Sequence, residues 1–254
     1  MHNNLPLQGK TIILTGTSKT STIIEEITTL GGRAIVTPLI ETCELIDQND
    51  EVQLEYARQF NWLIFTSQNA VDAFASKVKR FNLNAQHFQG KIASIGTKTT
   101  EALEELGFSV SFMPSVFSAD VFVKEFPSVA GENPSCLFIR GEKAKKTLKD
   151  GLPFEIKEWT IYETLERHDH KQIIINSIRE NKDVTVIFAS PSAVDVYALD
   201  VASVVGWEAV RVAAIGHITE AAIANHGATV DVKPNVYTMQ AVLEEIMKVE
   251  EQRT

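Results

Sequence analysis

The residues from Trp62 to Phe74, WLIFTSQNAVDAF, decide the fold of this chain. An apolar run of strand length ends in Thr66-Ser67, and apolar residues then recur at helical spacing from Val71 onward. This pattern predicts a buried strand whose carboxyl end leads directly into the start of a helix.

The same pattern is written a second time at 186–197, VIFASPSAVDVY, where Ser190 takes the place of Ser67. Two further blocks recur in the same order. SIGTKTTEALEELG, 94–107, returns as AIGHITEAAIANHG, 214–227, and PSVFSADVFVKEF, 114–126, returns as PNVYTMQAVLEEI, 234–246. The spacing between copies is far above the roughly 20 to 50 residues of solenoid repeats, so the blocks indicate two domain-sized copies of one α/β unit.

The composition is that of a soluble globular protein of two domains. The chain has 254 residues, 44% of them hydrophobic and 22% charged. No stretch approaches the roughly 20 apolar residues that span a bilayer, and MHNNLPLQGK lacks the apolar core of a signal peptide. Cys43 and Cys136 are not spaced as a metal site and fit a reduced cytoplasmic protein. The formal net charge of −9 argues against broad nucleic-acid binding.

Strands and helices alternate along the chain, which predicts parallel sheets covered by helices on both faces. Besides 62–74 and its repeat, strands are expected at 10–14, 34–40, 91–95, 110–113, 135–140, 156–162, 184–189, 212–215 and 229–232. Helices are expected at 23–30, 47–60, 97–106, 118–126, 168–181, 217–226 and 239–249, with a short basic helix after 141. Ser118 and Ser190 are predicted N-caps, and SVAGEN, between Pro127 and Pro134, has the composition of a linker.

Small and polar residues gather where strands end and helices begin. In parallel α/β sheets ligands bind at this edge, and the free N–H groups and positive dipole of a helix start suit a carboxylate or a phosphate. The residues concerned are Thr66-Ser67, Gly96-Thr97, Arg140-Gly141, Ser190 and Gly216-His217. One such residue is usually only a helix cap, but their recurrence predicts two anion-binding sets that line an interdomain cleft.

Motifs for other chemistry are missing from the sequence. It contains no GxGxxG, GxxxxGK[ST], GxSxG or HExxH pattern. His168-Asp169-His170 is interpreted as an exposed loop, and His217, at a helix start, as a ligand contact or a bystander. Tyr162, in WTIYET, follows a strand near the crossover between the copies. It is either a general acid or a packed strand tyrosine, and both interpretations stay open.

Taken together, the blocks resemble the uroporphyrinogen-III synthase family. The resemblance rests on FTSQNAV, SIGTKTTEAL, LFIRGE, IYET, FASPSAV and AIGHITEAA in this order, with Gly107, Pro114, Gly227 and Pro234, and it spans nearly the whole chain. It implies an α/β fold of two flavodoxin-like domains, with parallel sheets flanked by helices, joined by a two-stranded β connector. Domain 1 would be 1–38 with 166–254, domain 2 would be 43–158, and the connector strands would be 39–42 and 159–165. Two simple halves are the alternative that the repeat alone suggests.

The resemblance also implies a function, the cyclisation of hydroxymethylbilane to uroporphyrinogen III in tetrapyrrole (haem) biosynthesis. The last pyrrole ring, ring D, is inverted and water is lost, a hydro-lyase reaction that needs no cofactor and no metal. Tyr162 matches the family tyrosine suspected of assisting loss of the leaving group. The substrate-binding positions carried over are Thr66, Ser67, Asn69, Ala70, Gly96, Thr97, Thr99, Arg140, Gly141, Ser190, Ser192, Ala193, Gly216, His217 and Thr219.

The resemblance also implies which partners to expect. The ligand is the linear tetrapyrrole, and neither nucleic acid nor membrane is expected. The protein is expected to be a cytoplasmic monomer, and the resemblance leaves room for transient contact with the preceding enzyme of the pathway.

Two features depart from the family pattern. The first strand ends in TGT, 15–17, where many members have Thr-Arg. The negative net charge suits a polyanionic substrate only if Arg140, Lys143 and Lys19 create a local positive field. Two other functions remain as alternatives. One is a two-domain protein that binds a small anionic ligand without turnover, and the other is a nucleotide-dependent enzyme, which would lack every phosphate-loop motif.

Overall fold

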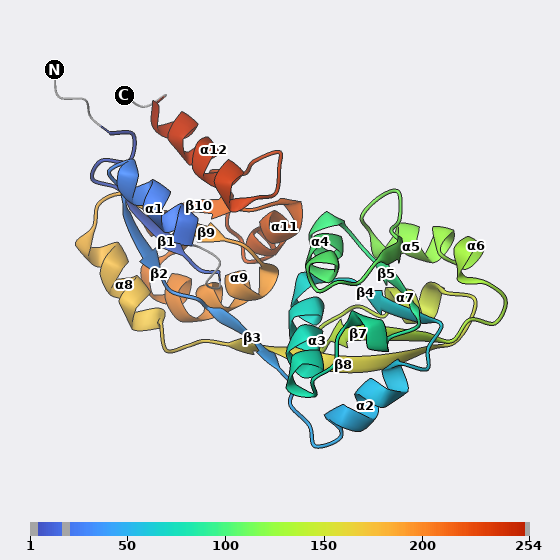
Figure 1. Cartoon of the computed structure of the whole chain (residues 1–254). Helices are drawn as coiled ribbons and strands as arrows, with labels where there is room; N and C mark the ends of the chain where they lie inside the picture. Colours follow the sequence, from blue (N-terminus) through green and yellow to red (C-terminus); the bar gives the residue numbers. More distant parts are fainter. Residues whose placement is uncertain (1–4, 17–20, 252–254) are drawn as a thin grey trace. The chain divides into compact units, whose positions relative to one another are not determined.

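The computed structural model describes residues 5–16 and 21–251 (Figure 1). The chain divides into two compact units, Met1–Glu41 with Leu165–Thr254, and Thr42–Thr164. Each unit is a mixed α/β fold built on its own sheet. The SVAGEN segment lies within the second unit, where Pro127–Ala130 forms helix α6, so its linker-like composition does not mark a boundary. None of the helices described is both long and apolar enough to cross a membrane.

The first unit contains a parallel sheet in the order β10-β9-β1-β2. Its strands are β1 (Thr11–Leu14), β2 (Arg33–Val36), β9 (Val184–Phe188) and β10 (Arg211–Ala214). Its helical segments are α1 (Ser21–Thr29), α8 (Lys171–Glu180), α9 (Pro191–Tyr197), η2 (Ala198–Ala202), α10 (Ser203–Val205), η3 (Trp207–Ala209), α11 (His217–Asn225) and α12 (Met239–Glu251). Successive strand residues face opposite sides, so Ile13 packs with α8, α9 and α11, whereas Ile12 packs with α1 and α12.

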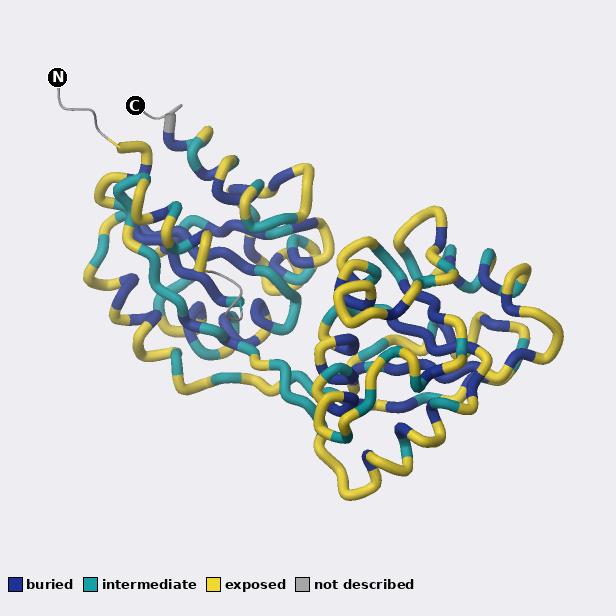
Figure 2. Tube along the Cα trace, in the orientation of Figure 1, coloured by how far each residue is buried: buried dark blue, intermediate teal, exposed yellow. Residues whose placement is uncertain are grey.

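The second unit contains the larger sheet, in the order β3-β8-β7-β4-β5-β6. Its strands are β3 (Ile40–Glu44), β4 (Trp62–Phe65), β5 (Lys91–Ser94), β6 (Val110–Phe112), β7 (Cys136–Gly141) and β8 (Ile156–Glu166). Its remaining helices are α2 (Asp50–Ala57), α3 (Gln68–Arg80), η1 (Ala85–His87), α4 (Thr97–Glu105), α5 (Ala119–Glu125) and α7 (Thr147–Gly151). Phe65 packs with α2, α3 and α4, and Ile64 packs with α5, α6 and α7 on the other face. In Figure 2 buried backbone runs through the middle of each unit, as sheets covered on both faces require.

The chain passes from one unit to the other within β3 and β8. The divisions at 41–42 and 164–165 fall inside these two strands. They are neighbours in the sheet, and hydrogen bonds of 2.9 Å continue beyond β3, from the Leu45 amide to the Ile161 carbonyl and from the Arg167 amide to the Leu39 carbonyl. From the sequence, domain 1 was expected to end at 38 and resume at 166, and domain 2 to run from 43 to 158.

Some predicted elements differ from those observed. The single strand expected at 34–40 is two strands, β2 and β3, because Pro38 between them has no N–H for a sheet. The strand expected at 229–232 is reduced to a single bridge between Ala213 and Val232. The Val212 amide of β10 donates to the Asp231 carboxylate at 2.8 Å, where a longer strand would offer a backbone carbonyl. The helices expected at 47–60 and 168–181 are shorter, and the basic helix is reduced to α7.

The core of the first unit contains a phenol without a hydrogen-bond partner. The side chain of Tyr197 is fully buried against Phe188 and Trp207, and no described group lies within hydrogen-bonding distance of its hydroxyl. Burial raises the pKa of this phenol. A buried hydroxyl that has lost its water and gained no partner opposes folding.

Tyr197→Phe should therefore raise the free energy of unfolding by about 1 kcal/mol, since it removes the unpaired hydroxyl and leaves the ring packing in place. Urea denaturation of the two proteins measures the difference. The matched control is Tyr56→Phe, at a tyrosine that is 42% exposed, which should change stability little. An unchanged or lower midpoint for Tyr197→Phe would show that the hydroxyl is satisfied.

Candidate active site

Ser67 lies between the end of β4 and the start of α3. This residue has extended backbone angles, φ −150° and ψ 149°, and its hydroxyl accepts the amide of Ala70 at 3.2 Å, which makes it the N-cap of α3. The Ser67 hydroxyl also lies 3.1 Å from the hydroxyl of Tyr162. The cap of the helix and the candidate acid are thus in direct contact.

Tyr162 reaches this position through an irregularity in the sheet. Arg140 of β7 pairs with Thr160 of β8, but the next residue, Gly141, pairs with Tyr162, so β8 carries one extra residue. A Cβ atom on Gly141 would lie 2.3 Å from Cζ of the Tyr162 ring. The phenol therefore lies across the end of β7, in space that only glycine leaves open.

The start of α3 has the features of an anion site. Ser67 satisfies the amide of Ala70, and the amides of Gln68 and Asn69 have no carbonyl one turn earlier in the helix. A helix of 13 residues places the positive end of its dipole at the same point. A carboxylate beside Tyr162 would be bound by these groups without a basic side chain.

The first unit repeats this helix start in α9. Ser190 has nearly the same backbone angles, φ −155° and ψ 153°, and accepts the amide of Ala193 at 3.3 Å. Pro191 occupies the first helical position, as the sequence predicts. The second pair of helix starts begins at glycine, with Gly96 before α4 and Gly216 before α11.

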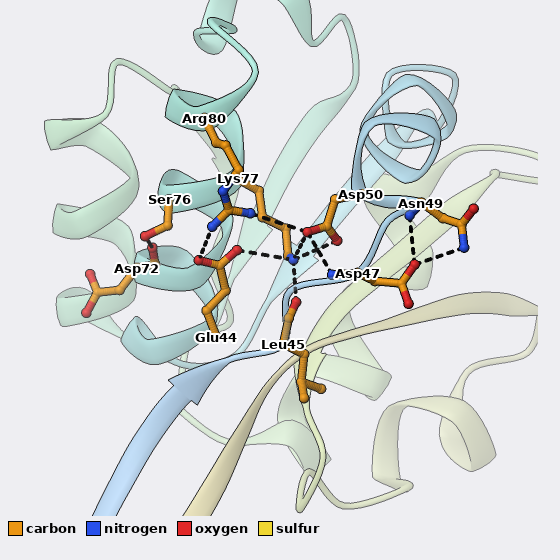
Figure 3. Close-up of polar contacts among 9 residues, drawn as sticks. All are labelled: Glu44, Leu45, Asp47, Asn49, Asp50, Asp72, Ser76, Lys77 and Arg80. Carbon is orange, nitrogen blue, oxygen red and sulfur yellow. Dashed lines mark hydrogen bonds and ion pairs between the residues drawn. The ribbon is translucent and has the colours of Figure 1, made fainter.

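A buried lysine fixes α3 at its other end (Figure 3). The fully buried ammonium of Lys77 lies 2.7 Å from both carboxylate oxygens of Asp50 and donates to the carbonyl of Leu45 at 2.5 Å. Glu44 lies 3.2 Å from the same nitrogen, and Arg80 bonds Glu44 at 2.7 Å. The cluster ties α3 to the end of β3 and the start of α2, and so holds the helix that carries Ser67.

Comparison with known proteins decides the family. The family model described as "Uroporphyrinogen-III synthase HemD" matches residues 21–244. The chain belongs to the uroporphyrinogen-III synthase family.

Individual relatives agree with this assignment. The "Porphyrin biosynthesis protein HemD" of Ruminiclostridium josui is 29% identical over 136 residues, 52% of this chain and 27% of that protein. The chain thus spans about a quarter of that relative's length. The "Uroporphyrinogen-III synthase" of Chlorobaculum parvum is 24% identical over 237 residues, 90% of this chain and 94% of the relative. A crystal structure of a mutant uroporphyrinogen III synthase from Thermus thermophilus has a similar fold, with a TM-score of 0.68 at 14% identity over 96% of this chain and 99% of that one.

The substrate-binding positions suggested by the family motifs fall into two groups. Those accessible to solvent are Thr66, Ser67, Asn69, Gly96, Thr97, Ser190, Ser192 and His217. Those that are buried are Ala70, Thr99, Gly141, Ala193, Gly216 and Thr219. The buried positions expose little of either their side chains or their backbone, so the accessible group is the better source of direct contacts with a substrate.

Arg140 has another set of partners. Its guanidinium pairs with the Glu158 carboxylate and donates to the carbonyls of Gly141, at 3.1 Å, and Ala144. Burial alone would raise the pKa of Glu158, but hydrogen bonds from Arg140 and Lys149 hold that pKa below its usual value. Arg140 thus links the carboxyl end of β7 to Glu158, near the start of β8, and to the turn that follows β7. Lys19, the third basic residue considered from the sequence, lies outside the described residues.

Sequence reasoning missed an aromatic residue beside each glycine helix start. The His217 ring lies 3.0 Å from the Tyr237 hydroxyl, and a Cβ on Gly216 would meet the Tyr237 ring at 2.9 Å. In the other copy, Phe117 lies 3.8 Å from where a Cβ on Gly96 would be. Both aromatic rings are about half exposed. The repeat PSVFS and PNVYT held the signal, because it aligns Phe117 with Tyr237.

The remaining histidine motif has a local role. His168 and Asp169 are exposed in the turn before α8, as predicted. A hydrogen bond of 2.6 Å to Asp200 raises the pKa of His168. Over residues 5–16 and 21–251, no three histidine, cysteine or acidic side chains are grouped to bind a metal ion.

A depression of about 470 Å³ in the second unit is unrelated to these residues. It is lined by Trp62 and Lys91, the first residues of β4 and β5. Ligands of open parallel sheets bind at the opposite, carboxyl end of the strands, where Ser67 and Tyr162 lie. The candidate active site is therefore placed around the Tyr162 phenol and not in this depression.

Proposed function

We propose that this chain catalyses the cyclisation of hydroxymethylbilane to uroporphyrinogen III, with inversion of the last pyrrole ring and loss of water. The observation that carries the proposal is the contact of 3.1 Å between the hydroxyls of Tyr162 and Ser67 at the start of α3. It unites a proton donor with an anion-binding helix start in a member of this family.

The acetate and propionate groups of the substrate are the proposed ligands of the helix starts. The amides in the first turn of a helix have no carbonyl partner within it and suit carboxylates, as at the starts of α3, α4 and α11. The start of α9 offers fewer, because Pro191 has no N–H and Ser190 already accepts the Ala193 amide. Because this binding uses the backbone, it does not require a basic side chain at each position. It accounts for how a chain of net charge −9 could hold a polyanion.

In the proposed reaction Tyr162 acts as the general acid. Its phenol gives its proton to the hydroxymethyl oxygen, the carbon–oxygen bond breaks, and water leaves. The electron-poor carbon that remains is attacked by the last ring at the carbon that already carries its bridge to the third ring, and a spiro intermediate forms. That older bridge bond then breaks, which leaves an electron-poor carbon on the third ring. This carbon bonds to the free alpha carbon of the last ring, which is thereby inverted. The proton lost from the pyrrole carbon at reclosure returns to the phenolate, so Tyr162 is regenerated.

The second role of the protein is to favour this closure over the spontaneous one, which gives isomer I. Holding the chain ends in one arrangement lowers the entropic part of the barrier to this closure and leaves the others disfavoured. The proposal extends to a cytoplasmic monomer of 28.2 kDa that acts as a hydro-lyase in haem biosynthesis. Light scattering coupled to size exclusion would test the monomer.

The test of turnover uses freshly made hydroxymethylbilane in large excess over protein. The proposal predicts that the bilane disappears much faster than it closes spontaneously, and that many equivalents are consumed per protein. The alternative, a binding protein without turnover, predicts slower closure, limited to one equivalent of protected bilane. The second result would overturn the proposal.

A further inference from the structure

We propose that Gly141 and Ser67 are positioning residues that fix the phenol of Tyr162 in one place and leave its proton free for the substrate. The inference rests on the proposed function of Tyr162 as the acid. It adds two residues that act through Tyr162, each by a different physical means, and it assigns Ser67 a role beyond carboxylate binding.

Gly141 acts through the absence of a side chain. A Cβ there would lie 2.3 Å from Cζ, 2.6 Å from Cε2 and 2.6 Å from the hydroxyl oxygen of Tyr162. These distances are far below van der Waals contact, and the atoms belong to a rigid ring at the last residue of β8 that pairs with β7. The register shift at Arg140 and Gly141 brings the Tyr162 ring to this point. The backbone amide of Glu142 donates to the Tyr162 carbonyl at 3.0 Å and fixes the backbone that carries the ring. Any larger residue would have to push the phenol aside.

Ser67 acts through its single proton. Its oxygen accepts the Ala70 amide at 3.2 Å, so the cap uses Ser67 as an acceptor and leaves its O–H to donate. The hydroxyls of Ser67 and Tyr162 lie 3.1 Å apart, a distance at which either can donate, and the proposal assigns Ser67 as the donor and the Tyr162 oxygen as the acceptor. The phenol then keeps its own O–H for the hydroxymethyl oxygen. After proton transfer, the oxygen left on Tyr162 still receives the hydrogen bond from Ser67.

The repeat shows that capping alone does not require this contact. Ser190 caps α9 with the same geometry, and within the described part of the chain its hydroxyl bonds the Ala193 amide without a tyrosine. Ser118 likewise caps α5 by accepting the Val121 amide at 3.2 Å. The tyrosine contact of Ser67 is therefore an addition to an ordinary cap.

The experiment measures kcat and KM for isomer III formation in matched variants. Ser67→Ala should lower kcat about tenfold with KM nearly unchanged, and Ser67→Thr, which keeps the hydroxyl, should restore most of it. Gly141→Ala should lower kcat about 100-fold, because a displacement of about 1 Å is enough for such a loss. Ser118→Ala removes a cap of the same kind and should leave kcat unchanged.

A control is also needed for the strain that Gly141→Ala introduces. Gly90→Ala forces a Cβ to within 2.4 Å of the Phe60 carbonyl at the opposite end of the same sheet. It should lower stability and leave the kcat of the folded fraction unchanged. If Gly141→Ala does not fold, Ser67→Ala in the Tyr162→Phe background decides. With the phenolic oxygen removed, the serine change should cost no further kcat.

Two outcomes overturn the positioning role. One is a kcat for Ser67→Ala within twofold of the wild type, and the other is an equal loss in the Tyr162→Phe background. Carbon-13 NMR of protein labelled at tyrosine Cζ distinguishes failure of the positioning role from failure of the proposed enzymatic function. The chain has four tyrosines, and the Tyr162 signal is the one that Tyr162→Phe removes. That signal should shift in Ser67→Ala even if the protein makes no isomer III, and an unmoved signal refutes the contact itself.

Discussion

Tyr162→Phe should lower kcat for uroporphyrinogen III formation by about 100-fold, the usual contribution of a positioned general acid, with KM nearly unchanged. The substitution removes only the hydroxyl that lies 3.1 Å from Ser67 and leaves the ring against Gly141. Substrate carboxylates would still meet the helix starts, so binding should survive. Steady-state kinetics with separated product isomers measures both constants.

The control for this variant is Tyr56→Phe, on the exposed surface of α2, which should retain full activity. Unfolding midpoints of both variants should lie close to that of the wild type, because Tyr162 is only half-buried and, among residues 5–16 and 21–251, its hydroxyl forms a hydrogen bond to one side chain. A Tyr162→Phe protein that folds and turns over within twofold of the wild type would exclude the phenol as the acid.

Lys77→Met should be the most destabilising single change among those considered. It removes the buried cation from Asp50, which is 2% exposed, and breaks the contacts to Leu45 and Glu44 drawn in Figure 3. Removing one partner of a buried pair leaves an uncompensated charge and costs about 3–5 kcal/mol. Arg80 remains 3.3 Å from Asp50 and would recover a part of this loss. Urea denaturation measures the change in the free energy of unfolding, with the dependence on urea concentration compared between the two proteins.

Two companions make this prediction specific. Lys79→Met lies on the exposed face of the same helix and should change the free energy of unfolding by less than about 0.5 kcal/mol. Adding Asp50→Asn to Lys77→Met should restore part of the lost stability, since the neutral amide is cheaper to bury than an unpaired carboxylate. If Lys77→Met is no more destabilising than Lys79→Met, the cluster does not hold α3 in place.

The local features of this protein could be predicted from its sequence because neighbouring residues determine them. Ser118 and Ser190 cap helices as expected, since each lies at the junction of an extended segment and an apolar helical pattern. The parallel α/β architecture followed from alternation of such patterns. Pro38 marks the division between β2 and β3, where the sequence predicted one strand.

The features that could not be predicted depend on partners far along the chain. Tyr162 and Ser67 are separated by 95 positions, and their contact requires an extra residue in β8 that no local pattern indicates. The 11-residue length of β8 depends on its pairing with β3. Lys77 did leave a signal that was not used, because it falls on the same helical stripe as Phe74 and Val78. A charged residue on an apolar stripe needs a buried partner, but sequence alone does not name Asp50.

The isomer composition of the product decides whether this chain is a uroporphyrinogen-III synthase. Purified protein receives freshly made hydroxymethylbilane, the product is oxidised, and isomers I and III are separated by chromatography. The account predicts that isomer III dominates and that its share rises with protein concentration over the spontaneous isomer I. Isomer I alone, from protein shown to be folded, would contradict it.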